Sequence, residues 1–178
     1  MKAFFFDRDG TLNIDPGYIN NPADMKLYQN VPKTLKYIKS LGYKIFVISN
    51  QSGIGRGKIK SDEFRRVNEK FLSLCGGSDI IDDIFYCLHT PEQNCPCRKP
   101  ETLFVDIAKE RYDIDCRKSY FAGDKMTDIA AGKKSGLRTI LVLNGIKKND
   151  IPHFNEDKDV KPDFIINSVS ELKKIIKN

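Results

Sequence analysis

The chain has 178 residues, of which 40% are hydrophobic, and it carries 30 Lys and Arg against 24 Asp and Glu, a net charge of +6. This length and composition predict one globular domain, residues 1–178, and exclude a disordered chain. The four apolar residues Ala3–Phe6 are too few for a signal-peptide core, and no stretch approaches the roughly eighteen apolar residues of a membrane span. We therefore expect a soluble, cytoplasmic protein without membrane contact.

Short apolar segments rich in β-branched and aromatic residues recur along the chain, and they predict strands buried on both faces. In chain order these segments are Lys2–Phe6, Lys44–Ser49, Ile84–Cys87, Tyr120–Ala122, Thr139–Leu143 and Phe164–Ile166.

Stretches with the apolar spacing of helices lie between these segments. The polar stretch 144–161 predicts an irregular surface loop. The expected helices cover Val31 to Leu41, Phe64 to Leu74 with Ser61 as N-cap, Leu103 to Arg111, Thr127–Ser135 closed by Gly136, and a C-terminal segment after a capping box of Ser168 and Glu171.

This alternation predicts an α/β fold with a doubly wound, Rossmann-like parallel sheet and helices on both faces. Ligands bind to such sheets outside the carboxyl ends of the strands. The residues that directly follow each predicted strand are therefore the candidates for a functional site.

Polar residues directly follow three of the predicted strands, and Arg98 to Pro100 opens the helix after the strand that ends at Cys87. Clustered carboxylates resist ionisation unless a cation lies among them, and Mg²⁺ prefers such oxygen ligands. A hydroxyl, a lysine and the backbone N–H groups of the predicted Gly-rich turn "SNQSGIGRG" could bind an anionic group, a combination that suits phosphoryl transfer. The segments are Asp7 to Thr11, Ser49 to Gly53, Arg98 to Pro100, and Gly123 to Lys125 with Asp128 one turn later.

Each segment alone also fits ordinary turn chemistry, but their common position after strands favours one shared site. The positive charge raises nucleic-acid binding as an alternative. The lysines are scattered without a basic stripe, so we expect no nucleic-acid partner. A nucleic-acid-binding module would also leave Asp7, Asp9 and Asp124 unexplained, because carboxylates repel phosphates.

Four short motifs occur in order across nearly the whole chain: "FFFDRDGT", "VISN", "RKP" and "GDKMTD". They resemble the four motifs of the haloacid dehalogenase superfamily of aspartate-dependent phosphatases. The stretches "DRDGTLNIDPGYI", "SNQSGIGRGK" and the Cys-His loop before "CRKP" are similar to its subfamily of heptose bisphosphate and histidinol-phosphate phosphatases.

The resemblance implies a role for each motif residue. Asp7 would be the nucleophile that forms an aspartyl-phosphate, and Asp9 the general acid and base. Ser49 and Lys99 would hold the transferring phosphoryl group, with help from Lys125. Mg²⁺ would bind Asp7, the backbone carbonyl of Asp9, and Asp124.

The resemblance also implies a substrate. We expect removal of the 7-phosphate of D-glycero-D-manno-heptose 1,7-bisphosphate, in the synthesis of nucleotide-activated heptose for lipopolysaccharide or capsule. Histidinol phosphate is the alternative substrate. The planar fork of Arg98 suits a second phosphate, which favours the bisphosphate.

Short distances between the motifs leave no room for a cap domain, since one helix and one strand fill each gap. We therefore expect an open site in a monomer, walled by loops. The residues expected to contact the phosphorylated sugar are Asp15, Tyr18, Asn50, Gln51, Ser52, Arg98 and Lys125.

The pattern Cys87-x-His89-x₅-Cys95-x-Cys97 supplies four ligands for a tetrahedral Zn²⁺. Because protein ligands fill all four positions, the ion would be structural and would hold the loop 87–97 next to Lys99. Free or buried cysteines and a redox pair of Cys95 with Cys97 are the alternatives.

Overall fold

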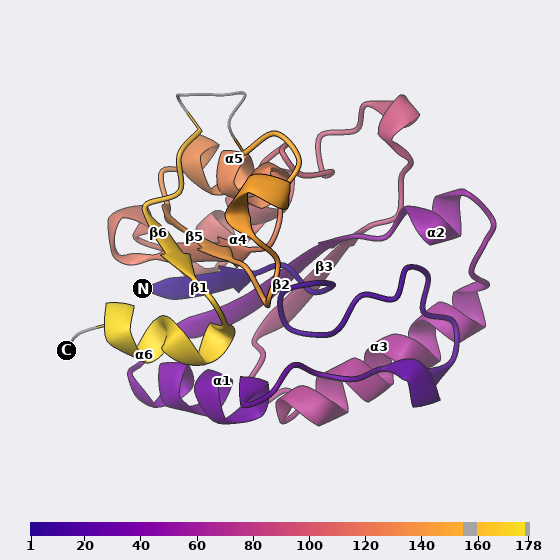
Figure 1. Ribbon diagram of the computed structural model, residues 1–178, viewed down its shortest axis with the longest axis horizontal. Coiled ribbons are helices and arrows are strands. Elements are labelled where there is room, and N and C mark those ends of the chain that lie inside the picture. The colour runs from indigo at the N-terminus through magenta and orange to yellow at the C-terminus, as the bar shows by residue number, and fades with distance from the viewer. Residues whose placement is uncertain (155–159, 177–178) are drawn as a thin grey trace.

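The computed structural model describes residues 1–154 and 160–176. Their strands form one parallel sheet in the order β3-β2-β1-β4-β5-β6 (Figure 1). The predicted α/β class and parallel sheet are confirmed. The strands are β1 (Ala3–Phe6), β2 (Lys44–Asn50), β3 (Asp83–Cys87), β4 (Tyr120–Gly123), β5 (Arg138–Val142) and β6 (Phe164–Ile166).

The sheet is covered by helices on both faces (Figure 1). Along β1, Phe4 and Phe6 pack on one face and Phe5 on the other, as the alternation of strand side chains requires. Burial on both faces is why β1 reads as an unbroken apolar run. The first face carries α1 (Val31–Ser40), α3 (Ser61–Cys75) and α6 (Leu172–Ile175); the second carries α4 (Leu103–Tyr112) and α5 (Met126–Lys134).

Two helix starts differ from the sequence prediction. Lys60 is the N-cap of α3 and Ser61 its first residue, because Glu63 accepts a hydrogen bond from the Lys60 backbone N–H at 2.9 Å. At the C-terminus, Ser168 makes no side-chain cap, and its hydroxyl pairs with Ser170 at 2.7 Å.

The connections contain short helices besides the predicted elements. The Gly-rich segment after β2 forms α2 (Ser52–Gly55), where a turn was expected. Residues 155–159 of the predicted loop lie outside the described residues. In the described part of the chain, no helix is long and apolar enough to cross a membrane. The 3₁₀ helices are Pro22–Asp24, Pro91–Gln93, Cys116–Lys118, Lys148–Asp150 and Val169–Glu171.

The strand order places β1 and β4 side by side at the middle of the sheet. The chain runs outward from β1 through β2 to β3, and then from β4 through β5 to β6. Such a switch point opens a crevice beyond the carboxyl ends of the central strands. Asp7 follows β1 and Asp124 follows β4, so both lie at this crevice.

Candidate active site

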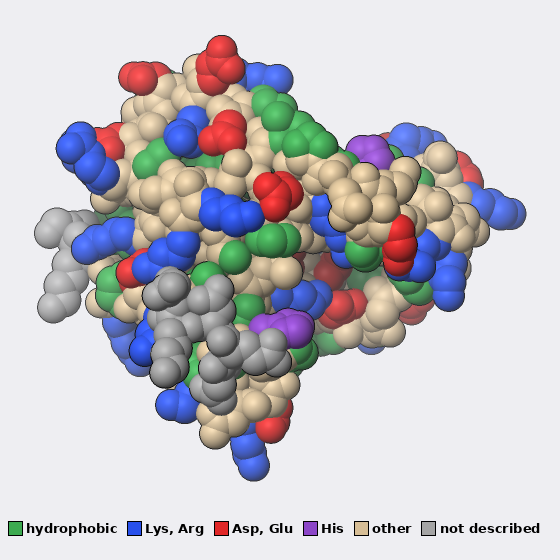
Figure 2. Space-filling view, turned by 90° about the horizontal axis from the view of Figure 1, so that it is seen from above, with side chains coloured by type: hydrophobic (Ala, Val, Ile, Leu, Met, Phe, Trp, Pro, Cys, Tyr) green, Lys and Arg blue, Asp and Glu red, His purple; other side chains and the backbone are tan. Residues whose placement is uncertain are grey.

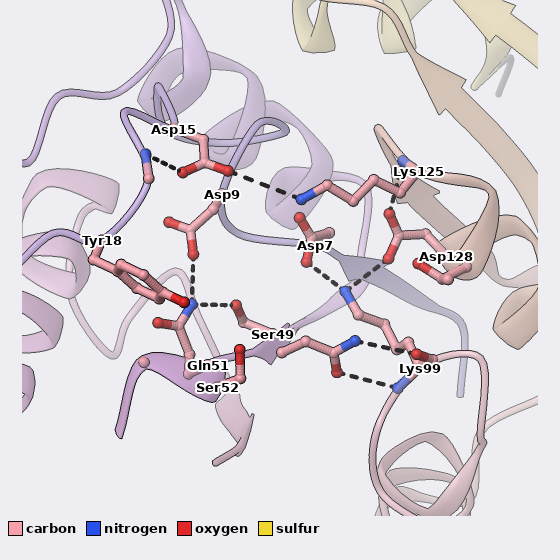
Figure 3. A pocket seen from close by; sticks show the side chains of 14 residues that line it. Asp7, Asp9, Asp15, Tyr18, Ser49, Gln51, Ser52, Lys99, Lys125 and Asp128 are labelled. Atoms are coloured by element: carbon pink, nitrogen blue, oxygen red, sulfur yellow. Dashed lines mark hydrogen bonds and ion pairs between the residues drawn. The ribbon is translucent and has the colours of Figure 1, made fainter. Parts of the chain in front are cut away.

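A pocket of about 210 Å³ opens at this edge of the sheet (Figure 3). Its walls come from the segments that follow β1, β2 and β4 and from the loop before α4, as the strand-end prediction required. The lining residues are Asp7, Asp9, Asp15, Gly17, Tyr18, Ser49, Asn50, Gln51, Ser52, Gly53, Lys99, Lys125, Thr127 and Asp128.

Lys99 forms the centre of the pocket's polar network. Its ammonium group donates to a carboxylate oxygen of Asp7 and to Asp128 Oδ1 at 2.7 Å (Figure 3), and also to the Ile48 carbonyl at 2.7 Å. Only 4% of Lys99 is exposed. Burial alone would lower its pKa, but Asp128 and Asp7 outweigh burial and raise it. Lys99 is therefore a fixed positive charge.

Asn50 holds the backbone of Lys99. Its Oδ1 accepts from the Lys99 backbone N–H, and its Nδ2 donates to the Lys99 carbonyl, each at 3.1 Å. This reciprocal pair joins the end of β2 to the loop before α4. The side chain of Asn50 thus lines the pocket, as expected, while its amide is engaged with the backbone.

Carboxylates crowd around Asp7. Oxygen atoms of Asp7, Asp124 and Asp128 lie within 4.8 Å of one another. Burial raises the pKa of Asp7 well above its ordinary value, and the charges of Asp128 and Asp124 raise it further against the opposing effect of Lys99. The pKa of Asp124 is raised by burial and by Asp128. A cation among these oxygens would relieve both penalties.

The turn after Asp9 brings Asp124 close. Gly10 has φ of +87°, and a Cβ at this position would collide with the Asp124 carboxylate. Thr11 Oγ1 donates to Asp124 Oδ1 at 3.0 Å. The "DGT" of the first motif thus positions a carboxylate that follows β4.

Asp9 lies at the pocket wall with its oxygens occupied by donors. Oδ1 accepts from Arg8 Nε at 3.0 Å and from Asn13 Nδ2 at 2.9 Å, and Oδ2 accepts from Arg8 Nη2 at 2.8 Å and from Gln51 Nε2. Burial acts to raise the pKa of Asp9, but the Arg8 charge and these hydrogen bonds lower it overall. Gln51 Nε2 also reaches Ser49 Oγ at 2.7 Å, which links the second motif to Asp9 (Figure 3).

The rim of the pocket is formed by an exposed loop. Tyr18 is 50% exposed, with its ring against Gly53, where a Cβ would approach the ring to 2.7 Å. Asp15 Oδ1 accepts from the Gly17 N–H at 2.9 Å, and Asp15 Oδ2 lies 3.9 Å from Lys125 Nζ (Figure 3). Burial lowers the pKa of Lys125, but Asp124 and Asp7 raise it overall.

Arg98 lies outside this pocket, in a neighbouring hollow of about 720 Å³. Its Nη1 donates to the His89 carbonyl at 3.3 Å. The two hollows share part of their lining, so they lie next to each other. The residues that line both are Asn50, Ser52, Lys99, Lys125 and Thr127.

The four predicted ligands of the cysteine loop come together. The sulfur atoms of Cys87, Cys95 and Cys97 lie 3.3–3.5 Å apart, and His89 Nδ1 lies 3.3 Å from Cys97 Sγ and 3.7 Å from Cys87 Sγ. These separations exceed a disulfide bond of about 2.05 Å. They approach the roughly 3.8 Å between sulfur ligands of a tetrahedral Zn²⁺.

Sequence reasoning missed Arg8 as a partner of Asp9 and Thr127 as a lining residue. It did place Asp128 in the shared site, one helical turn after Gly123 to Lys125. Asp128 accepts from the Lys125 backbone N–H at 3.0 Å at the start of α5, and also pairs with Lys99. Its spacing of one helical turn from Asp124 was the available signal. No sequence pattern indicated that the Arg8 side chain would bind Asp9.

Comparison with known proteins places this geometry in a family. Residues 96–172 match the HAD-hydrolase-like family model. The chain is 35% identical to a D-glycero-beta-D-manno-heptose-1,7-bisphosphate 7-phosphatase of Haemophilus ducreyi, over 96% of each chain. It is 34% identical to a D-glycero-alpha-D-manno-heptose-1,7-bisphosphate 7-phosphatase of Campylobacter jejuni, over 90% of this chain and 92% of that relative.

A solved structure shows the same fold. The D,D-heptose 1,7-bisphosphate phosphatase from B. bronchiseptica, complexed with magnesium and phosphate, aligns with a TM-score of 0.82 at 24% identity. The alignment covers 98% of this chain and 97% of that one. With sequence relatives of more than 30% identity along almost its whole length, the chain belongs to the haloacid dehalogenase-like hydrolases, in the family of the heptose bisphosphate phosphatases.

Proposed function

We propose that this protein is a Mg²⁺-dependent phosphatase that removes the 7-phosphate of D-glycero-D-manno-heptose 1,7-bisphosphate, in the synthesis of nucleotide-activated heptose. The observation that carries the proposal is the buried group of Asp7, Lys99 and Asp128 at the strand ends. The names of the relatives support the substrate.

Asp7 acts as the nucleophile. A carboxylate oxygen forms a bond to phosphorus as the bond from phosphorus to the sugar oxygen breaks, which gives an aspartyl-phosphate. Asp9 gives a proton to the departing sugar oxygen, and then takes one from the water that hydrolyses the intermediate. Ser49, Lys99 and Lys125 hold the phosphoryl oxygens, since a hydroxyl and two cations face the same pocket.

The donor set fits Mg²⁺. Asp7, Asp124 and the backbone carbonyl of Asp9 would hold the ion, and their oxygen atoms are the ligands that Mg²⁺ prefers. Bound there, Mg²⁺ would neutralise charge on the phosphoryl group. Asp128 is the third carboxylate of the cluster, but it is engaged by Lys99 and the start of α5, so we assign it to positioning.

The chain forms a single domain, 1–178, without a cap over the pocket. Between Thr11 and Ser49 the chain forms the 3₁₀ helix Pro22–Asp24, α1 and β2, which supports this proposal. The substrate then contacts loops, with Asp15, Tyr18, Gln51 and Ser52 on one side. We infer that the enzyme acts as a cytoplasmic monomer.

Substrate choice rests on the second hollow. A sugar with two phosphates has anionic groups at both ends. Lys99 and Lys125 line both hollows, and Arg98 lines the second hollow but not the first. The 7-phosphate lies at Asp7 and the 1-phosphate near Arg98. Histidinol phosphate, the second candidate, carries a cation that Arg98 would repel.

We also propose that Cys87, His89, Cys95 and Cys97 bind one structural Zn²⁺. The ligand atoms already converge, and all four positions are filled by protein. The ion would fix the loop that leads directly into Arg98 and Lys99. A catalytic role is not expected, because the site leaves no open position for substrate.

A nucleic-acid-binding module remains disfavoured. Lys and Arg are interspersed with Asp and Glu on the face seen in Figure 2, without a continuous basic stripe. The carboxylates at the pocket would repel a phosphate backbone in the absence of a cation.

Phosphate release by the wild-type protein, with and without Mg²⁺, tests the proposal. We expect kcat/KM to be highest for the heptose bisphosphate and at least about tenfold lower for histidinol phosphate, a difference of about 1.4 kcal/mol in transition-state binding. A preference for histidinol phosphate, or release that does not require a divalent cation, would refute the assignment.

A further inference from the structure

Arg8 stands between the two aspartates of the first motif, but it does not line the pocket in the described part of the chain. Its side chain is buried, with 2% of the residue exposed. Nε and Nη2 grip both oxygens of Asp9, at 3.0 Å and 2.8 Å. The remaining nitrogen, Nη1, donates to Oδ1 of Asn68 on α3. A buried chain of contacts therefore runs from α3 through Arg8 to Asp9.

Aromatic rings fix the guanidinium group in this position. The Arg8 Cζ atom lies 5.9 Å from the ring centroid of Phe71 on α3 and 5.9 Å from that of Tyr86 on β3. Cations over ring faces are held by the ring quadrupole. The guanidinium thus has little freedom to turn away from Asp9.

Among the described residues, the side chain of Asn68 hydrogen-bonds to Arg8 and to no other residue. Its buried Nδ2 has no hydrogen-bond partner within residues 1–154 and 160–176. A buried amide that leaves one group unpaired costs about 1–3 kcal/mol. In the described residues, the side chain of Asn68 therefore makes one hydrogen bond, and that bond holds Arg8.

We propose that Arg8, anchored by Asn68, is a positioning residue that orients the Asp9 carboxylate for proton transfer. The planar fork of arginine fixes both oxygens of the carboxylate at once, which the point charge of a lysine could not do. Arg8 and Asn13 hold Asp9 from behind, while Gln51 bonds it from the pocket side. The departing oxygen of the substrate takes the place of Gln51.

This inference rests on the proposed function, in which Asp9 gives its proton to the sugar oxygen. A sugar alkoxide leaves poorly without that proton, whereas p-nitrophenolate leaves without one. Misalignment of Asp9 should therefore slow sugar esters much more than aryl esters. The ratio kcat/KM reports the steps up to departure of the alcohol, so it isolates this difference from later hydrolysis of the intermediate.

The test compares heptose bisphosphate with p-nitrophenyl phosphate in the Mg²⁺-loaded enzyme. For Arg8→Lys we expect kcat/KM on the sugar ester to fall about 100-fold, the scale of one positioned general acid. The same ratio on the aryl ester should fall less than about threefold, with KM for the sugar nearly unchanged. Asn68→Leu should give the same selectivity with a smaller loss, and Glu69→Gln on the same helix should match wild type.

Equal losses on the two esters would show that Arg8 merely supports the fold and would overturn the inference. Full activity of both variants on the sugar ester would overturn it as well. Circular dichroism and thermal melting check folding, and if Arg8→Lys does not fold, Asn68→Leu alone decides, because it leaves Arg8 in place. If wild type hydrolyses neither ester, the proposed function fails together with this inference.

Discussion

Asp7 is buried between Lys99 on one side and the carboxylates Asp124 and Asp128 on the other. Its charge is offset within the protein by Lys99 and would be offset further by a metal ion. An amide in its place would keep the shape of the side chain but remove the attacking oxygen anion and its charge beside Lys99.

Asp7→Asn should lower kcat by at least about 10³-fold, because covalent catalysis is lost. Phosphate release from heptose bisphosphate measures the effect. Asp24→Asn, a change at an exposed position in a 3₁₀ helix, is the matched control and should keep full activity. Retention of more than about a tenth of the wild-type rate by Asp7→Asn would contradict the nucleophile assignment.

Arg98→Ala should lower kcat/KM for the bisphosphate. The corresponding loss of transition-state stabilisation should be about 1.5–3 kcal/mol, the scale of a charge-assisted hydrogen bond. The loss for a heptose 7-monophosphate should be much smaller, because the group that Arg98 binds is absent. Arg65→Ala, which removes a surface arginine paired with Glu69, serves as control. Equal losses on the two substrates would count against a second phosphate site at Arg98.

At the scale of elements, the regular strands and helices were predictable because their side chains pack into one core. The sequence predicted Lys44–Ser49 as a strand, and β2 covers Lys44–Asn50. Boundaries set by single side chains were less predictable: Glu63 moves the cap of α3 to Lys60. The Gly-rich segment formed α2 rather than a turn, since glycine leaves several backbone conformations open.

The candidate site was predictable to the extent that it lies at strand ends. The pocket gathers the residues that follow β1, β2 and β4. The contacts between distant elements were not predictable, because no local spacing encodes them. Arg8 donates a hydrogen bond to Asn68, which lies 60 residues later in the sequence. Asn50 hydrogen-bonds to the backbone of Lys99, which lies 49 residues later.

The cysteine loop should hold about one Zn²⁺ per chain. Cys95→Ser removes one ligand, so we expect lower zinc content by elemental analysis and a higher KM as Arg98 loses its fixed position. Cys116→Ser, outside the cluster, should retain its zinc and its KM. Wild-type protein that contains no metal after purification without chelators would rule out the structural site.

At the scale of the whole molecule, Asp82 joins three parts of the fold. Its carboxylate accepts from Lys39 on α1, from Lys44 at 2.7 Å, and from the Ile45 backbone N–H at 2.9 Å. Burial acts to raise the pKa of Asp82, but these donors lower it overall. The folded protein therefore binds the Asp82 proton more weakly than the unfolded chain, and this stabilisation is present above the unfolded pKa of about 3.9.

Asp82→Asn should reduce the free energy of unfolding at pH 7 by about 1 kcal/mol, because both lysines remain partly exposed and screened. The difference from wild type should shrink as the pH falls below 4 through the folded pKa, where wild type also loses the charge. Thermal melts across this pH range measure it. Asp79→Asn, at an exposed position, is the control, and a difference that persists unchanged at low pH would contradict the ion-pair explanation.

The clasp between Asn50 and the Lys99 backbone has a consequence for how such enzymes diversify. It secures the lysine from β2, independently of the exposed stretch Pro91 to Asn94 between the predicted zinc ligands. That stretch also borders the hollow next to Arg98. Insertions in this stretch could change substrate preference during evolution without moving Lys99. Substrate selectivity and phosphoryl-transfer chemistry can therefore evolve independently.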